Sequence, residues 1–174
     1  CERIYVGKRG GRKSHSQQQI NALLVEHARQ GRAVVRLKGG DPLVFGRGGE
    51  EALLLRAAGI PFEIVPGISA ASGATTYAGI PLTHRGLASV AVLVTGNEDP
   101  DKKENGVDWP RLAAMDATLV VFMAARKLDV ICQTLIDNGR PAHTPAAVVE
   151  WGTWPEQRTI TDTLEHLATR AAAA

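Results

Sequence analysis

The segment from Val34 to Glu50 constrains the fold of this 174-residue chain more than any other. A β-branched run leads into the turn Gly39-Gly40-Asp41-Pro42, and a helix is expected to begin near Glu50. In open α/β sheets ligands bind where strands end, and adjacent glycines let the main chain approach a ligand closely. Three cations flank the turn: Arg36, Lys38 and Arg47. These features predict a ligand-binding loop, although glycine, aspartate and proline also dominate ordinary turns.

Short apolar runs alternate with helical periodicity along the chain, which is typical of an α/β fold with a parallel sheet. Strands are expected at 3–6, 33–38, 61–65, 89–95, 118–123, 146–150 and 157–161. Helices are expected from Ser14 or Ser16 to Gly31, at 50–58, 70–78, 108–115 and 128–138, and from 162 onward. The segment 79–86 contains no clear element. We therefore predict an N-terminal domain over 1–84 and a C-terminal domain over 85–174.

Composition excludes several classes of function. The net charge of +2 is too small to favour nucleic acid binding, and no apolar run approaches the roughly 20 residues that span a bilayer. Cys1 and Cys132 are far apart, which fits a reducing cytoplasm better than a disulfide framework. The histidines show no metal-ligand spacing, so no metal site is expected. A strand follows Cys1 almost directly, and we expect an upstream part of the protein that this sequence lacks.

A basic loop follows the first predicted strand and contains Lys8, Arg9, Arg12 and Lys13. It is either a solvated cationic loop, as most surface charge runs are, or a cluster that binds an anionic substrate. A lysine among other cations has a lowered pKa, which suits a proton donor near neutral pH. Both interpretations remain open on the residues alone.

Two other strand ends carry candidate site residues. The sequence Pro66-Gly67-Ile68-Ser69-Ala70-Ala71 leads from a strand into a helix, whose free N–H groups could hold a carboxylate or a ribose. Ser69 is also a suitable N-cap, and both roles are compatible. Met123 ends a later strand and, from its residue type alone, is core filler. Cys132 is expected in the middle of a helix and buried, and no GxSxG motif supports a nucleophilic triad.

Taken together, the motifs resemble those of the uroporphyrinogen-III C-methyltransferases, within the tetrapyrrole methylase superfamily. They are collinear and span nearly the whole chain: GKRGG at 7–11, VVRLKGGDPLVFGRGGE at 34–50, VPGISAAS at 65–72, GIPLTHR at 79–85, VTG at 94–96, Asp108-Trp109, and EWGT at 150–153. The GGDP motif is shared by the wider superfamily. The GKR-G loop, FGRGGE and PLTHR point to this family in particular.

The resemblance implies the α/β tetrapyrrole methylase fold, with two α/β/α domains, an active cleft between them, and a first domain that is incomplete here. It implies a cytoplasmic homodimer that transfers methyl groups from S-adenosyl-L-methionine to C2 and C7 of uroporphyrinogen III. The products are S-adenosyl-L-homocysteine and precorrin-2, which feeds siroheme and cobalamin synthesis. The carboxylates of a tetrapyrrole would explain a cationic cleft in a nearly neutral protein.

By position in the motifs, the resemblance also implies roles for individual residues. Cofactor contacts are implied for Gly39, Gly40, Asp41, Val44, Ser69, Ala70, Met123 and Gly152, which replaces the core-filler interpretation of Met123. Lys8 matches the proton-donor lysine of the family. Arg36 and Arg47 match arginines that bind substrate or support catalysis.

The chain also departs from the family pattern. The first strand, with its glycine-rich cofactor loop, and the aspartate that accepts a proton would lie before Cys1, and the last strand of the second domain is also expected to be missing. Two alternatives therefore stay open. The protein could be a later corrin-pathway methylase, or this chain could bind cofactor or tetrapyrrole without turnover.

Overall fold

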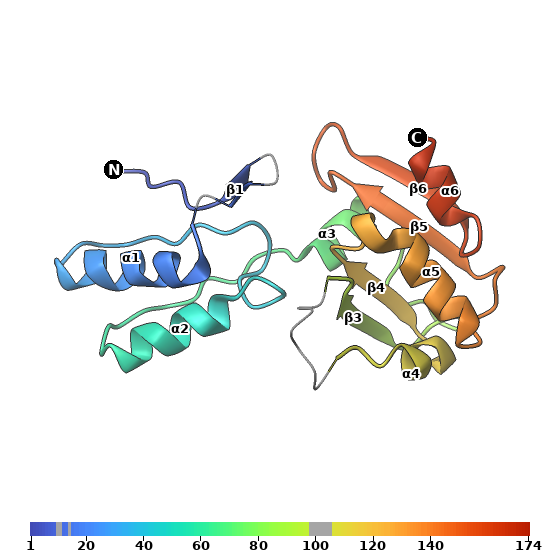
Figure 1. Cartoon of the computed structure of the whole chain (residues 1–174), viewed down its shortest axis with the longest axis horizontal. Helices are drawn as coiled ribbons and strands as arrows, with labels where there is room; N and C mark the ends of the chain where they lie inside the picture. The colour runs from blue at the N-terminus through green and yellow to red at the C-terminus, as the bar shows by residue number, and fades with distance from the viewer. Residues whose placement is uncertain (10–11, 14, 98–105) are drawn as a thin grey trace. The chain divides into compact units, whose positions relative to one another are not determined.

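The computed structural model describes residues 1–9, 12–13, 15–97 and 106–174. The chain divides into two compact units, Cys1–Ile68 and Ser69–Ala174 (Figure 1). The division falls before the boundary at 84/85 that the sequence predicts, because helix α3 (Ala70–Tyr77) is grouped with the second unit. Ala74 of α3 lies directly against Gly152 there. The domain boundary at 84/85 stays a prediction.

In the first unit, α1 (Gln17–Arg29) and α2 (Gly48–Ala57) confirm two of the predicted helices. A reciprocal capping box starts α1. The Ser16 hydroxyl oxygen accepts from the Gln19 amide at 3.2 Å, and the Gln19 side chain accepts from the Ser16 amide at 2.7 Å. Ile20 and Leu24 form the buried face of this helix. The helix α2 begins two positions earlier than expected, at Gly48 rather than Glu50.

The basic loop of the first unit contains a short antiparallel hairpin, which the sequence did not predict. Its strands are β1 (Lys8–Arg9) and β2 (Arg12–Lys13), with Lys8 opposite Lys13 in the register.

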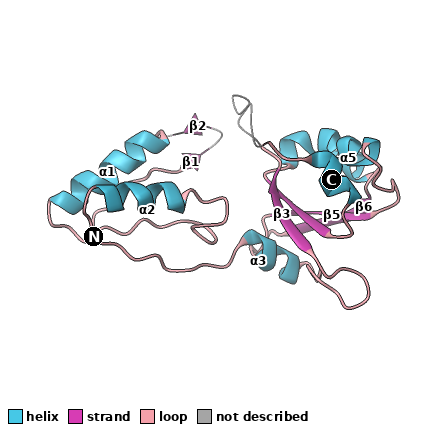
Figure 2. Cartoon of the chain, turned by 90° about the horizontal axis from the view of Figure 1, so that it is seen from below, coloured by secondary structure: helices cyan, strands magenta, loops and turns pink. Residues whose placement is uncertain are grey.

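The strands predicted at 3–6, 33–38 and 61–65 are wrong for this structure, which gives them no strand pairing within the described residues; Figure 2 draws them as loop. Their apolar side chains are largely exposed, with Val35 at 86% and Leu37 at 84%. The β-branched composition of 33–38 is typical of a strand. A strand, however, exists only through its hydrogen-bonded ladder, and the described part of the chain gives these segments no ladder partner.

The described residues of the second unit form two small sheets. Strand β3 (Ala91–Thr95) is parallel to β4 (Thr118–Phe122), as predicted, with Leu93 opposite Val120. Strand β5 (Pro145–Glu150) instead pairs antiparallel with β6 (Arg158–Thr163), which corrects the expectation of parallel pairing throughout. A hairpin connection leaves no crossover between β5 and β6, so these strands run in opposite directions. Because β6 extends to Thr163, the helix expected from 162 begins only at Leu167.

Helices cover one face of these strands and enclose the core of the second unit (Figures 1 and 2). They are α4 (Trp109–Ala114), the 3₁₀ turn η1 (Ala125–Lys127), α5 (Leu128–Asp137) and α6 (Leu167–Ala172). The buried cluster consists of Ala113, Ile131, Cys132, Leu135, Leu164 and Leu167. Cys132 is buried in α5 as predicted, and burial raises the pKa of its thiol. Within the described residues, no helix is both long and apolar enough to cross a membrane.

Candidate active site

The loop at Gly39, Gly40 and Asp41 presents exposed main chain in the first unit. Gly40 has a φ of 76°, in the left-handed region that favours glycine. A Cβ atom at Gly39 would meet open space. Among the described residues, the amides of Gly39 and Gly40 have no hydrogen-bond partner. This loop therefore offers two main-chain donors to a ligand with acceptor atoms.

The Asp41 side chain ties this loop to its surroundings. Its Oδ1 accepts from the Leu43 amide at 2.8 Å, and its Oδ2 accepts from the Gly67 amide at 3.2 Å. These main-chain donors hold the pKa of Asp41 below its ordinary value, the Leu43 amide most strongly. Asp41 is thus an ionised acceptor that already has two partners.

The next turn, from Pro42 to Gly48, is compact because it contains two glycines, Gly46 and Gly48. The Gly48 amide donates to the Pro42 carbonyl oxygen at 2.9 Å. A Cβ atom at Gly46 or at Gly48 would lie 2.5 Å from that oxygen, so neither position accepts a side chain without movement. Val44, half-buried, donates from its amide to the Asp41 carbonyl oxygen at 3.4 Å. Close backbone contact therefore explains Gly46 and Gly48 of the FGRGG sequence.

Arg36 and Lys38 do not stand free, because both contact Glu51 of α2. Lys38 Nζ lies 2.9 Å from Glu51 Oε2, and Arg36 Nε lies 3.3 Å from Glu51 Oε1. Gln17 of α1 also donates to Oε1, at 3.0 Å. Burial alone raises the pKa of Glu51. The hydrogen bonds from Lys38 and Gln17, with the charges of Lys38 and Arg36, outweigh burial and hold that pKa below its ordinary value.

Glu51 was missed by sequence reasoning, although it is only 5% exposed and is the centre of this network. No local pattern indicates it, because its partners lie 13, 15 and 34 residues away. A buried carboxylate is expected to have cationic partners, and here they are supplied from separate segments. Gly67 was also missed as a partner of Asp41. The Pro-Gly pair after a predicted strand was the available signal for it.

Arg47, the third predicted cation, precedes α2 with a φ of 60°. Its guanidinium contacts Glu50 through two hydrogen bonds, at 2.8 and 2.6 Å, and both side chains are about half exposed. The hydrogen bond from Arg47 lowers the pKa of Glu50. An exposed pair of this kind is weak and exchanges easily with another anion. Arg47 is therefore more available to an anionic ligand than Arg36.

The second unit brings Gly152 against α3, the helix that Ser69 and Ala70 begin. Ser69 Oγ accepts from the Ala71 amide at 3.3 Å, so its predicted N-cap role is confirmed. Gly152 has no room for a Cβ atom, which would overlap the side chain of Ala74. The helix start and the Gly152 turn are consequently parts of one packed region.

Met123 follows β4 directly and is 56% exposed, which contradicts the core-filler interpretation. It has a φ of 58°, and Trp151 beside Gly152 has a φ of 53°. Left-handed conformations at non-glycine residues are costly and concentrate at functional sites. Met123 and Trp151 are therefore two positions of the second unit with an unusual backbone conformation.

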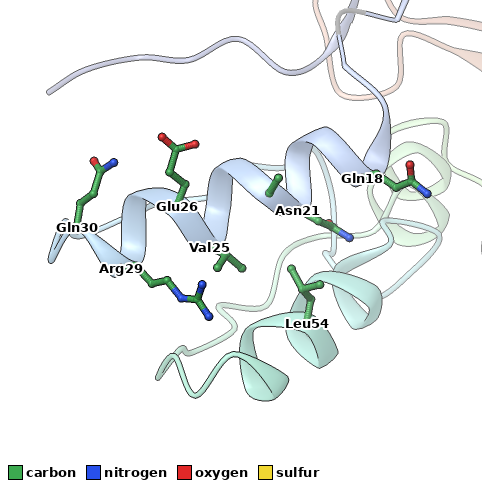
Figure 3. A pocket seen from close by; sticks show the side chains of 8 residues that line it. Gln18, Asn21, Val25, Glu26, Arg29, Gln30 and Leu54 are labelled. Atoms are coloured by element: carbon green, nitrogen blue, oxygen red, sulfur yellow. The ribbon is translucent and has the colours of Figure 1, made fainter.

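Lys8 lies in β1, opposite Lys13. A groove with a volume of about 780 Å³ lies elsewhere in the first unit, between α1 and α2 (Figure 3). Its lining residues come from α1, from Gln30 at its end and from Leu54 of α2. They differ from all the residues predicted for the site.

The sequence and the fold place this chain in a known class of proteins. The chain is a member of the tetrapyrrole (corrin/porphyrin) methylases, whose family model matches residues 3–168. Its similarity to solved structures agrees with that α/β fold. Over 93% of this chain and 69% of the other, it is 42% identical to uroporphyrin-III C-methyltransferase from Thermus thermophilus, with a TM-score of 0.75. A structure of that enzyme complexed with S-adenosyl homocysteine is 39% identical, with a TM-score of 0.74, over 88% of this chain and 66% of that one.

Curated relatives are more similar in sequence but longer. The chain is 52% identical over 167 residues to siroheme synthase 1 of Cronobacter sakazakii, covering 96% of this chain and 35% of that protein. It is 54% identical over 168 residues to siroheme synthase of Neisseria meningitidis serogroup B, covering 97% of this chain and 34% of that protein. The chain thus spans about a third of the length of these relatives.

Proposed function

We propose that this protein catalyses S-adenosylmethionine-dependent methylation of uroporphyrinogen III at C2 and C7, giving precorrin-2 for siroheme or cobalamin synthesis. The observation that carries the proposal is the match of residues 3–168 to the tetrapyrrole methylases, together with 42% identity to a uroporphyrin-III C-methyltransferase. The exposed Gly39–Gly40 main chain supports it, because two amides without a partner among the described residues suit an acceptor-rich ligand.

S-adenosylmethionine would supply an activated methyl group on a sulfonium, so the protein has mainly to align the reacting atoms. We propose that Gly39, Gly40, Asp41 and Val44 hold the cofactor. The same role is proposed for Ser69, Ala70, Met123 and Gly152. Support comes from the open main chain at Gly39 and from the packing of Gly152 on α3.

The substrate carries several carboxylates, and arginine binds carboxylates bidentately. Arg47 can exchange its exposed partner Glu50 for such an anion. Arg36 is held by Glu51, and we propose that it supports the site through that network and adds positive charge to it. Lys8 is proposed as the proton donor, because attack by a pyrrole carbon is coupled to proton movements.

We further propose a cytoplasmic homodimer whose active cleft lies between an N-terminal domain (1–84) and a C-terminal domain (85–174). Light scattering on the purified gene product would measure the dimer, and fractionation of cells would test its location. A monomer at micromolar concentration contradicts the dimer.

A methyl-transfer assay tests the reaction. The complete gene product and the 174-residue chain are each incubated with uroporphyrinogen III and S-adenosylmethionine, and precorrin-2 is detected by absorbance and mass. We expect two methyl groups per tetrapyrrole from the complete product. If that product methylates only a later precorrin, the alternative of a corrin-pathway methylase replaces this proposal. If it methylates and the 174-residue chain only binds, the chain alone is a non-catalytic binding module.

The role of Lys8 is tested by Lys8→Met, with Lys13→Met as a matched control because Lys13 is its register partner in the same hairpin. We expect kcat to fall by about 100-fold for Lys8→Met, in line with the loss of a general acid, while cofactor affinity changes little. Equal losses of turnover and cofactor affinity, or equal effects of the two substitutions, would sink the proton-donor role.

A further inference from the structure

We propose that the Asp41 carboxylate is a latch between two loops. By bonding the Gly67 amide, it fixes the Gly39–Gly40 main chain in its ligand-binding position, and Asp41 contacts the cofactor through its main chain only. The inference rests on the proposed function and deepens it, since it assigns a positioning role to Asp41 and adds Gly67 to the site.

Both oxygens of the carboxylate are already used. Oδ1 accepts from Leu43 within the loop, and Oδ2 accepts from Gly67, which lies 26 residues further along the chain. The first bond shapes the turn, and the second joins it to the segment that follows 61–65. The lowered pKa of Asp41 keeps the carboxylate ionised, so both bonds are charge-assisted.

Gly67 permits this contact only because it lacks a side chain. A Cβ atom there would lie 3.0 Å from the Gly40 carbonyl carbon and would overlap the carbonyl oxygen. The two main chains therefore touch at the same point where Asp41 joins them. Any side chain at Gly67 pushes Gly40 away without changing the chemistry of Asp41.

The latch matters because, within the described residues, no other hydrogen bond joins these two segments. Within the described residues, 33–38 and 61–65 share no strand ladder that would set their spacing. On the other side of the loop, Lys38 is anchored to Glu51. The Gly39–Gly40 amides are thus fixed by one anchor before them and by the latch after them.

A double-mutant cycle tests the latch, with Asp41→Asn, Gly67→Ala and the combined variant made in the complete gene product. Asparagine keeps one acceptor and loses the other, while Gly67→Ala leaves the carboxylate intact. We expect each single change to weaken binding of S-adenosylhomocysteine, measured by calorimetry, by about tenfold. The combined change should weaken it by about tenfold as well, because both changes open the same contact. The KM for the tetrapyrrole should stay unchanged.

Gly49→Ala is the matched control, since Gly49 is exposed in α2 and a Cβ atom there meets nothing. Its cofactor affinity should equal that of the unmodified protein. A loss of about 100-fold in the combined variant indicates independent contributions and overturns the latch. Normal affinity for S-adenosylhomocysteine in Gly67→Ala also overturns the latch.

Hydrogen exchange separates this inference from the proposed function and needs no ligand or turnover. The Leu43 and Gly67 amides should exchange faster in Asp41→Asn than in the unmodified protein. If the unmodified protein transfers no methyl groups but these amides lose protection, the function fails and the latch stands. If Asp41→Asn weakens binding while both amides stay protected, the carboxylate contacts the ligand directly and the latch is refuted. Should Gly67→Ala not fold, the exchange result in Asp41→Asn decides alone.

Discussion

The two compact units of this protein are each stabilised by a different kind of internal contact. The second unit buries an apolar cluster in which α4, α5 and α6 pack on two small sheets. Among the described residues of the first unit, the buried large apolar side chains are Ile20 and Leu24 of α1, and the carboxylate of Glu51 in α2 is buried as well. The proposed ligand loop lies in this first unit, where polar contacts decide its shape.

The difference shows that a functional loop can be specified by few contacts. Apolar burial is spread over many atoms, so the loss of one contact is shared among its neighbours. A polar anchor such as Glu51 or Asp41 depends on one carboxylate and a few defined donors. We therefore expect the second unit to respond to changes of volume and the first to changes of charge and hydrogen bonding.

The largest expected effect is in the apolar core. Leu135→Ala, at a position 4% exposed in α5, should lower the free energy of unfolding by about 3 kcal/mol. Val130→Ala on the exposed side of the same helix is the control and should cost far less. Urea unfolding measures both. Hydrogen exchange should show the loss of amide protection in residues 109–172. Equal loss in both units would contradict their separate character.

The next largest effect on stability is expected from the removal of Glu51. Glu51→Ala leaves Lys38 and Arg36 without their partner and should cost about 2 kcal/mol, less than the roughly 3–5 kcal/mol of a fully buried pair, because Arg36 is 28% exposed. Glu50→Ala is the neighbouring control and should change stability little, since its pair with Arg47 is exposed. Exchange protection in α1 and α2 is the measurement. Similar effects of the two substitutions would show that the network contributes nothing special.

Acid should weaken the first unit through the same carboxylate. The pKa of Glu51 in the folded protein lies below its ordinary value of 4.5. The contribution of Glu51 to the free energy of unfolding is therefore complete above that value, and it is lost as the pH falls through the folded-state pKa. Protection of α2 should decline with acid in the unmodified protein and depend less on pH in Glu51→Gln. A parallel decline in both proteins would assign the acid sensitivity to another group.

The smallest expected effect is at the start of α1. Ser16→Ala removes the hydroxyl that accepts from Gln19 and should cost about 1 kcal/mol. Ser69→Ala at the start of α3 is the counterpart in the second unit, and thermal unfolding compares the two. An unchanged melting temperature in Ser16→Ala would show that the capping box does not limit the stability of the first unit.

Much of the fold could be predicted from local patterns. Helical periodicity with a capping serine predicted α1, and buried Cys132 in α5 followed from its place in an apolar helix. Pairing direction could not be predicted in the same way. The antiparallel partner of β5 depends on which segments meet in space, as does the lack of a ladder partner for 33–38 among the described residues. Strand propensity carries no such information.

For the candidate site, too, local patterns predicted one part and tertiary contacts determined the other. The sequence by itself determined the family and a glycine-rich loop with cations around it, because glycine, proline and charge leave local signals. Only the tertiary structure showed that Glu51 holds Arg36 and Lys38, that Asp41 reaches Gly67, and that Gly152 packs on α3. The physical reason is distance along the chain. Each of these contacts joins residues that are separated by 13 or more positions, so no pattern within one segment can record them.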